Sequence, residues 1–232
     1  MNNALLTFSM FGLIFIIVAA VQFWIERQLS RDIEAGTPLI YRISAISSIL
    51  VPLIERLKLA GSTIRIVGYD GEYLSNTGDP LSLYKSWRLK KALEKWTKMG
   101  AKIEYFLISP SEKTRNFYEN LRDQINAENE ERAISFFFLD SDRIQAASEV
   151  GQIAEEFETL HPTLINTVDG DAFWVEYDHP KGKKRAQNTK FVPPSAMDLP
   201  MEKLEFDVYN DKISKLREYL CETAKTPAIN PA

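Results

Sequence analysis

The stretch TIRIVGY, residues 63–69, decides the fold of this chain. It is rich in β-branched residues and is bounded by a glycine and an aspartate, a pattern that indicates a β-strand. AKIEYFLIS, residues 101–109, and the almost wholly apolar AISFFFL, residues 133–139, indicate two further strands. Helical patterns over residues 83–99 and 110–127 separate the three strands. This alternation predicts an α/β fold with right-handed crossovers and a mainly parallel sheet flanked by helices.

Aromatic residues are expected to build the core of this sheet. Trp87 and Trp96 lie on or near one apolar face of the helix at 83–99, so we expect one or both to be buried. The three phenylalanines at 136–138 indicate a core strand and not a stacking platform for bases. Cys221 is the only cysteine, which excludes an intrachain disulfide, and its apolar neighbours predict a small buried side chain.

The chain after the third strand predicts a helix, a hairpin and a closing helix. The helix is expected over residues 145–159 and the closing helix over residues 204–224. Between them, residues 163–168 and 172–177 flank Asp169-Gly170, a dipeptide typical of a hairpin turn. These elements place the α/β domain at residues 62–225, followed by a Pro-containing tail at 226–232.

Residues 26–61 read as a juxtamembrane linker and a connecting helix. Thr37 and Pro38 resemble an N-cap followed by a proline at the first helical position. Apolar residues then recur at helical spacing from residue 40 to residue 57, and Pro52 is expected to kink the helix or begin a second one. We expect the apolar side of this helix to pack on the domain, with a contact between two copies in a dimer as the alternative.

Residues 4–25 (ALLTFSMFGLIFIIVAAVQFWI) form an uncharged, almost wholly apolar run. As a helix of 1.5 Å rise per residue they would reach about 33 Å, enough to cross the hydrocarbon core of a bilayer. Trp24 stands where an interfacial aromatic anchor is expected. A cleaved signal peptide or a buried core helix is the alternative, but no basic residue precedes the run. The sequence therefore predicts a transmembrane anchor over residues 1–25.

The flanking charges predict the orientation of this anchor. Arg27, Arg31 and Arg42 follow the apolar run, and no lysine or arginine precedes it. Positively charged flanks stay in the cytoplasm, so we expect a single-pass protein with a cytoplasmic C-terminal domain, in a bacterial inner membrane or an equivalent membrane. The net charge of −4 over 232 residues argues against a protein with a broad basic face for nucleic acid.

Three stretches of this order resemble the phospholipase D-like domain family. PLIERLKLAGSTIRIVGYD (residues 52–70) is similar to its opening helix and strand, and ALEKWTKMGAKIEYFL (92–107) to its next helix–glycine–strand unit. HPTLINTVDGDAFWVE (161–176) stands where the family places its signature strand and turn. The resemblance covers about residues 51–177 and implies the phospholipase D-like fold. It also implies that chains with one signature pair to complete a single site.

The signature of that family is His-x-Lys, four residues, then Asp, and this chain departs from it. In active members the histidine attacks phosphorus and the lysine neutralises the phosphate oxygens. Here His161 matches the histidine, Thr163 replaces the lysine, and Asp169 falls one residue late. A second His-x-Lys at His179 has Ala186 at the aspartate position. The resemblance thus implies a degenerate motif with His161 and Asp169 as candidate catalytic residues.

A basic loop provides the other candidate site. It contains Lys181, Lys183, Lys184 and Arg185, with Lys190 close behind. The loop reads as solvated, as a contact for anionic lipid head groups, or, least favoured, as a contact for nucleic acid. No metal or cofactor is expected, because the chain has no ligand-spaced histidine pair, no cysteine cluster, no phosphate-binding loop and no Gly-x-Ser-x-Gly elbow.

These observations predict a membrane-anchored, cytosolic binding or scaffolding module with a degenerate phospholipase D-like domain. Its expected partners are the membrane through residues 4–25, a second copy of the chain or another membrane protein, and a phosphate-bearing ligand or anionic lipid. The alternative is a membrane-anchored phosphodiesterase or phospholipase with an atypical histidine site.

Overall fold

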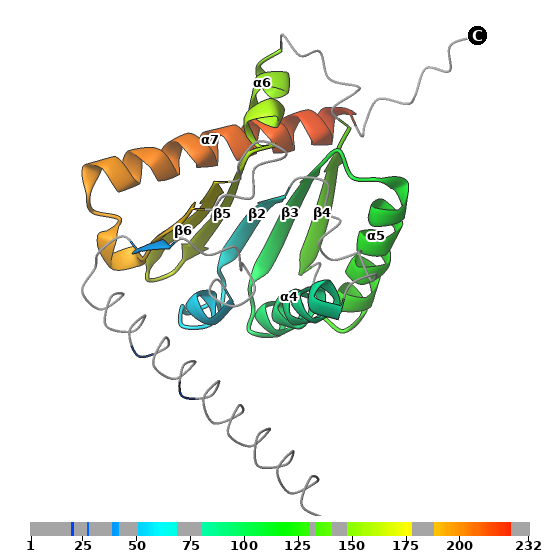
Figure 1. The fold of residues 1–232 in the computed structure, drawn as a ribbon, viewed down its shortest axis with the longest axis horizontal. Coiled ribbons are helices and arrows are strands. Elements are labelled where there is room, and N and C mark those ends of the chain that lie inside the picture. The colour runs from blue at the N-terminus through cyan, green and yellow to red at the C-terminus, as the bar shows by residue number, and fades with distance from the viewer. Residues whose placement is uncertain are drawn as a thin grey trace, which may run out of the picture.

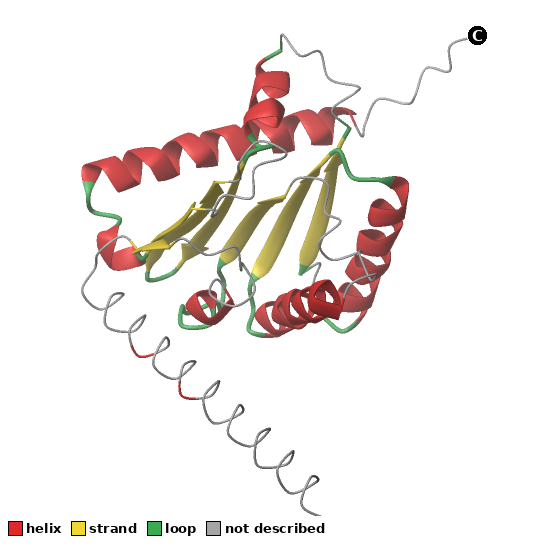
Figure 2. Ribbon diagram, in the orientation of Figure 1, coloured by secondary structure: helices red, strands yellow, loops and turns green. Residues whose placement is uncertain are grey.

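The structure is a computed structural model that describes residues 20, 27, 39–41, 51–68, 80–129, 133–140, 148–177 and 188–223. A mixed sheet lies between two layers of helices (Figures 1 and 2). The seven strands run in the order β1-β7-β6-β5-β2-β3-β4 across the sheet. The strands are β1 Leu39–Tyr41, β2 Thr63–Gly68, β3 Lys102–Ile108, β4 Ile134–Leu139, β5 Leu160–Thr167, β6 Gly170–Tyr177 and β7 Asn188–Val192.

Helices cover both faces of the sheet, so the domain has two hydrophobic layers. The helices are α4 Pro80–Lys98, α5 Glu112–Ala127, α6 Glu149–Glu156 and α7 Pro200–Thr223, with a short 3-10 helix η2 at Pro194–Ala196. Buried residues of α4 and α5 pack with one face of the sheet, and those of α6 and α7 pack with the other. The predicted α/β fold with flanking helices is therefore confirmed.

The sheet is mixed and not mainly parallel as predicted. β2, β3 and β4 are parallel neighbours, which fits helical crossovers through α4 and α5. After α6 the chain enters the sheet on the other side of β2, and β5 runs antiparallel to it. β5, β6 and β7 then pair antiparallel with one another in chain order. The sequence indicated the β5–β6 hairpin, but local patterns do not specify the direction in which β5 meets β2.

Local signals explain where several elements begin and end. The hydroxyls of Ser111 and Ser148 accept hydrogen bonds from the backbone N–H groups of Thr114 (3.2 Å) and Gly151 (3.0 Å), and so cap α5 and α6. Each cap of this kind stabilises a helix by about 1 kcal/mol. Gly170 adopts a φ of 131°, which lets the chain reverse in the tight turn between β5 and β6. The predicted hairpin is confirmed, but its two turn residues are Val168 and Asp169, one position earlier than the predicted Asp169-Gly170.

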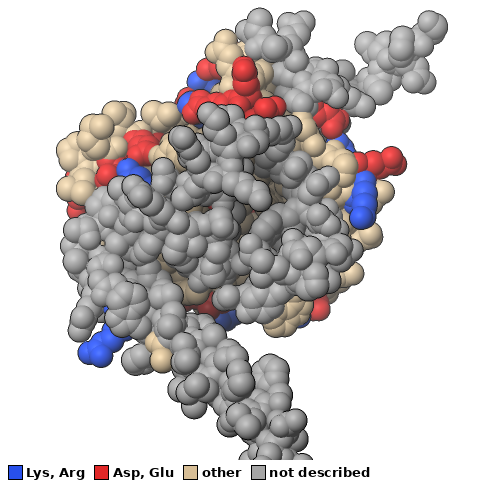
Figure 3. All heavy atoms as spheres, in the orientation of Figure 1, with Lys and Arg blue, Asp and Glu red and all other residues tan. Residues whose placement is uncertain are grey.

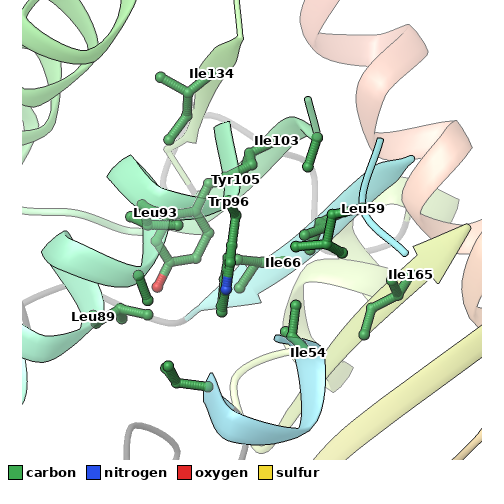
Figure 4. Packing of buried hydrophobic residues seen from close by; sticks show 14 of the residues in the cluster. Ile54, Leu59, Ile66, Leu89, Leu93, Trp96, Ile103, Tyr105, Ile134 and Ile165 are labelled. Carbon is green, nitrogen blue, oxygen red and sulfur yellow. The ribbon is translucent and has the colours of Figure 1, made fainter. Parts of the chain in front are cut away.

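The layer under α4 and α5 holds the largest buried side chains. Figure 4 shows Trp96, Leu89 and Leu93 of α4 turned toward Tyr105 and Ile66 of the sheet. Trp96 is fully buried, as predicted, whereas Trp87 is 57% exposed. The inward-facing phenylalanine of the 136–138 run, Phe136, packs with the rings of Tyr105 and Tyr118 at 5.7 and 4.9 Å between centroids. The prediction that this run is a core strand is therefore confirmed.

Two sequence-based expectations are corrected by the fold. Leu39–Tyr41 is a strand and not part of a connecting helix, because its backbone pairs with the edge of β7, far away in the sequence. Within the described part of the linker, helix is found at residue 27 and at residues 51–54. Cys221 is exposed and not buried, because the buried side of α7 ends earlier, at Leu216.

Several predicted segments lie outside the described residues. Apart from residue 20, the proposed anchor at 4–25 is among them, as are most of the juxtamembrane linker and the tail at 226–232. Among the residues that the structure describes, no helix is both long enough and apolar enough to cross a membrane.

Candidate functional site

A row of polar side chains crosses the antiparallel part of the sheet near the carboxyl end of β2. His161 on β5 lies directly opposite Glu176 on β6, and Glu176 lies opposite Thr189 on β7. Alternate residues of a strand share a face, so these three lie on the same face as Ile165, Trp174 and Phe191. That face is the one covered by α4 and α5. We call His161, Glu176 and Thr189 the polar row.

The polar row is largely shielded from solvent. Glu176 is 3% exposed and Thr189 is fully buried. The Nε2 atom of His161 is buried too. Residues directly opposite each other in an antiparallel pair have Cβ atoms about 4.5–5.5 Å apart, so the imidazole and the carboxylate are neighbours. A buried carboxylate is costly unless it is paired or hydrogen-bonded, and an imidazole at this distance is a suitable partner.

This arrangement can orient an imidazole. A carboxylate that accepts a hydrogen bond from one ring nitrogen fixes the tautomer and the orientation of the ring, and leaves the other nitrogen for chemistry. The same contact also serves as a purely structural pair in a buried sheet. The burial of Nε2 favours the structural role in this conformation.

Gly68 and Tyr105 border the polar row on the side of the parallel strands. The pairing of β2 with β5 ends at Ile66 opposite Thr163, and two further residues on each strand bring Gly68 toward His161. A Cβ atom at residue 68 would lie 3.2 Å from the Tyr105 hydroxyl oxygen. Glycine at this position therefore allows the phenol of Tyr105 to lie against the strand at the edge of the polar row.

A strained residue marks the same edge of the sheet. Ser109, directly after β3, has a φ of 53°, in the left-handed region that is unfavourable for a residue with a side chain. Its N–H donates to the carbonyl of Leu139 at the end of β4, at 2.7 Å. Such conformations cost about 1–3 kcal/mol and are common near functional sites. Here the left-handed conformation of Ser109 also turns the chain at the end of β3 toward Ser111, the N-cap of α5.

The position that the family resemblance assigns to lysine is closed. Thr163 is 3% exposed and lies between Ile66 of β2 and Trp174 of β6. A threonine carries no charge, and the neighbouring side chains leave it little access to solvent. The structure therefore offers no cationic group at residue 163 for a phosphate.

Asp169 does not share a site with His161. It lies in the turn at the opposite end of β5, and the stretch of strand from His161 to Thr167 spans about 20 Å. Its side chain is 50% exposed and forms a 2.9 Å ion pair with Lys58. The neighbour that the fold gives to His161 is thus Glu176 and not Asp169.

The basic loop and the second histidine lie outside the described residues, but Lys190 does not. It lies on the opposite face of the sheet from the polar row, where its Nζ contacts Glu202 at 2.5 Å and Glu205 at 2.7 Å. Burial lowers the pKa of Lys190, but the hydrogen bonds and negative charge of the two glutamates outweigh this effect and raise it overall. Lys190 is therefore engaged within the domain and does not extend the basic loop.

Tyr177 and Tyr209 complete the cluster around Lys190. Both hydroxyls donate to the same oxygen of Glu205, at 3.1 and 3.2 Å. Burial raises the pKa of both phenols, and the negative charge of Glu205 raises them further. The cluster joins β6 and β7 to the first turns of α7, which is a structural role.

Sequence reasoning did not identify Glu176, Thr189 or Tyr105. The signal for Glu176 was its place in the apolar strand AFWVE, where a charged residue falls on the inward-facing side of the alternation. Thr189 and Tyr105 had no such signal, because their contribution depends on strands distant in the sequence. Within the described ranges, no group of three or more His, Cys, Asp or Glu side chains could hold a metal ion.

Two open pockets, of about 310 Å³ and about 370 Å³, lie away from the polar row. The smaller is lined by residues of α4, including Thr97, and by residues at and just after the end of α5, including Asn129. The larger lies at β4, the last strand of the described sheet, between Arg115 and Tyr219. Neither pocket includes a residue of the polar row, which is a packed part of the sheet and not the floor of either pocket.

Comparisons with known proteins establish no family for the chain. No protein-family model matches the sequence, and no curated protein matches it. Among solved structures, the chain is similar to a crystal structure of polyphosphate kinase from Porphyromonas gingivalis, with a TM-score of 0.43 and 12% identity over 83% of this chain. The chain spans 27% of the length of that protein. At these values the similarity assigns neither a family nor an activity.

Proposed function

We propose that the chain is a membrane-tethered binding module whose α/β domain is a phospholipase D-like domain without phosphodiesterase activity. The order of elements is consistent with this proposal. The stretches that resemble the family coincide with β2, with α4 and β3, and with the β5–β6 hairpin. The tether is residues 4–25, with the domain on the cytoplasmic side.

One observation carries the loss of activity: a buried carboxylate faces the histidine that would attack phosphorus. Glu176 lies opposite His161, and in its ionised form it would repel the anionic oxygens of a phosphodiester. A phosphoryl-transfer site needs the reverse, a cationic clamp on those oxygens. With Thr163 in place of the lysine and Nε2 of His161 buried, the polar row lacks both the clamp and an accessible nucleophile.

The position of His161 directly opposite a carboxylate favours a second candidate function. The pair is the kind of arrangement that orients an imidazole for nucleophilic or general base catalysis. In that case the chain would be a membrane-anchored phosphodiesterase or phospholipase that uses His161, and a second copy of the chain or a basic loop would supply the missing cation. The binding module remains the favoured function, because this alternative needs the ring nitrogen to become exposed.

A hydrolysis assay on the full chain in nanodiscs separates the two functions. The substrates are a phosphodiester dye, a cardiolipin-type lipid and single-stranded nucleic acid. We expect no turnover above background and no change in His161→Ala. His179→Ala is the matched control, since it removes the only other histidine. Turnover that is lost in His161→Ala and kept in His179→Ala would overturn the binding-module proposal and establish the enzyme.

The tether is tested separately from the chemistry. A reporter that is active only in the cytoplasm is fused after Ala232, and a reporter that is active only outside the cytoplasm is fused at the same place in a second chain. We expect only the first to be active. The reverse result would invert the topology, and recovery of the whole chain in the soluble fraction would remove the tether.

A further inference from the structure

Four exposed apolar side chains gather at the beginning of α7. Leu199, Met201, Leu204 and Val208 are 46%, 74%, 59% and 42% exposed. They make up more than half of the large hydrophobic residues that are exposed in the described part of the chain. We call them the apolar stripe. In Figure 3 the corresponding left end of α7 shows mainly uncharged surface, with acidic and basic groups beside it.

The apolar stripe follows one side of the helix. Met201, Leu204 and Val208 are spaced by three and four positions, so they lie one above another. The core-facing side of α7 is a different one, formed by Phe206, Tyr209, Ile213 and Leu216. The stripe is therefore an additional apolar side and not the rim of the core.

Farther along α7, the short helix α6 packs against it. There Lys212 forms an ion pair with Glu156 at 2.5 Å, and Lys215 one with Glu149 at 2.6 Å. These lysines come after Val208, so α6 packs beyond the end of the stripe. The two ends of one helix thus differ: the second half is held to another helix, and the first half presents bare apolar side chains.

The chain connectivity limits the distance between the proposed tether and the edge of the sheet that adjoins the stripe. β1 pairs with β7, and β7 leads through η2 directly into α7. β1 begins at Leu39, and the proposed span ends at Ile25. The chain between them, residues 26–38, reaches at most about 45 Å when fully extended. Among the strands of the described sheet, β1 is therefore nearest to the proposed tether along the chain. The start of α7 follows closely after β7, the partner of β1.

The charges around the stripe decide what covers it. Asp198, Asp207 and Lys203 are exposed near it, and together they carry one net negative charge. Glu202 and Glu205 share the single cation of Lys190, which leaves a second negative charge beside the stripe. Two copies joined through the stripe would bring these like charges together in one contact, which is unfavourable. An electrically neutral apolar layer avoids this repulsion and suits the stripe.

We propose that the apolar stripe of α7 lies in the interfacial region of the bilayer that carries the tether. This proposal rests on the proposed membrane tethering. A short amphipathic helix binds such an interface through its apolar side, and the tether removes most of the entropic cost of bringing it there. Because the described charged residues beside the stripe are net negative, the contact depends on hydrocarbon burial and not on anionic lipid. The domain would then be fixed with the start of α7 against the membrane.

The test places a polarity-sensitive fluorophore on the stripe. The full chain in a Cys221→Ser background carries a single cysteine at Leu204→Cys, labelled and reconstituted in phosphatidylcholine nanodiscs. Asp123→Cys is the control, because the side chain of Asp123 is 69% exposed on α5, in the layer on the other side of the sheet. We expect blue-shifted emission at residue 204 and several-fold stronger quenching by nitroxide-labelled lipid than at residue 123.

Each other outcome of this test overturns the proposal in a distinguishable way. Equal quenching at residues 204 and 123, with the chain inside the nanodisc, overturns the contact and leaves the tether intact. Blue-shifted emission without lipid quenching shows that protein, such as a second copy, covers the stripe. Quenching that occurs only with anionic lipid would indicate that the basic loop, and not the apolar stripe, holds the domain at the membrane. A chain that does not enter nanodiscs overturns the tether, and with it this contact.

Discussion

The parallel and antiparallel halves of the sheet share one buried layer but differ in what their inward positions carry. At the carboxyl end of the parallel half, Gly68, Leu107 and Phe138 are neighbours across β2, β3 and β4. In the antiparallel half, the corresponding row is His161, Glu176 and Thr189. The row on the parallel strands thus contains no ionisable side chain. The ionisable side chains of the two rows, His161 and Glu176, both belong to the antiparallel half.

The largest expected effect tests whether the two halves form one core. Trp96→Ala on α4 and Trp174→Ala on β6 both remove rings that are at most 1% exposed. Each should lower the free energy of unfolding by about 3–5 kcal/mol through lost burial and a cavity. Denaturant unfolding followed by circular dichroism measures this loss. Trp87→Ala is the control, with a loss under about 0.5 kcal/mol. A large loss of unfolding free energy for only one of the two variants would show that the two halves unfold as independent units.

The second prediction concerns the polar row itself. Glu176→Gln keeps the shape of the side chain but replaces the buried carboxylate by an amide, so we expect a loss of about 1–3 kcal/mol in unfolding free energy. His161→Ala should lose a similar amount, because its Nε2 is buried. Glu218→Gln, at an exposed position on α7, provides the matched control. If both polar-row variants are as stable as this control, His161 and Glu176 do not stabilise the fold through a buried interaction.

Substitutions at Gly170, in the antiparallel half, and at Gly68, in the parallel half, allow the stability of the two halves to be compared. Gly170→Ala forces a side chain into a φ of 131° and should cost about 1–2 kcal/mol. Gly68→Ala creates only a tight contact with the end of the Tyr105 side chain, so its cost should be smaller. Thermal unfolding of the two variants measures the difference. A larger loss for Gly68→Ala would show that Tyr105 is held rigidly at the edge of the polar row.

The pH dependence of stability tests the cluster that joins the antiparallel half to α7. The pKa values of Lys190, Tyr177 and Tyr209 are all raised in the folded protein. Groups with a raised pKa contribute stability that is present below their unfolded pKa and is lost as pH rises through the folded pKa. Unfolding free energy should therefore fall above about pH 10, where these groups titrate in the unfolded chain.

Lys190→Met is the variant that isolates this cluster. At pH 7 it should lose about 1 kcal/mol, because two glutamates are left without their cation. The difference between the wild type and the variant should shrink as the pH rises above the unfolded pKa of lysine. Urea unfolding from neutral pH to about pH 11.5 measures both curves. A difference that stays constant across this range would contradict the assignment of the shift to Glu202 and Glu205.

The smallest effect is expected at the far end of α7. Cys221 is exposed, so Cys221→Ser should change the unfolding free energy by less than about 0.5 kcal/mol. Reaction of the native chain with a water-soluble maleimide should be complete without denaturant. Slow labelling that requires unfolding would show that Cys221 is covered, and would reinstate the buried side chain that the sequence predicts.

The parallel half could be predicted from sequence because its signals are local. Uninterrupted apolar runs, a glycine at residue 100 and helical spacing of Leu89, Leu93 and Trp96 indicate strands and helices without knowledge of their neighbours. Trp87 shows where this reasoning ends. It stands nine positions before Trp96, which in a helix of about 3.6 residues per turn is the opposite side of α4, so grouping the two on one face was wrong and Trp87 is exposed while Trp96 is buried.

The antiparallel half resisted prediction because its decisive contacts are distant in sequence. Leu39–Tyr41 has apolar residues that suit a helix stripe as well as a strand, and only pairing with Phe191 and its neighbours selects the strand. The partner of His161 was sought by motif spacing, at Asp169. The register of the hairpin instead places Glu176, on the next strand, beside it. Motif spacing along the chain does not contain this register.

The pairing of β1 with β7 has a mechanical consequence. β1 is three residues long and occupies the outermost position of the sheet, so it holds the N-terminal part of the chain to the domain by a few hydrogen bonds. A pulling force applied to the chain ahead of Leu39 loads these bonds before it loads the buried layers. Under tension β1 should therefore detach first. Its release would lengthen the connection by the residues up to the helix at 51–54 and leave the folded domain intact.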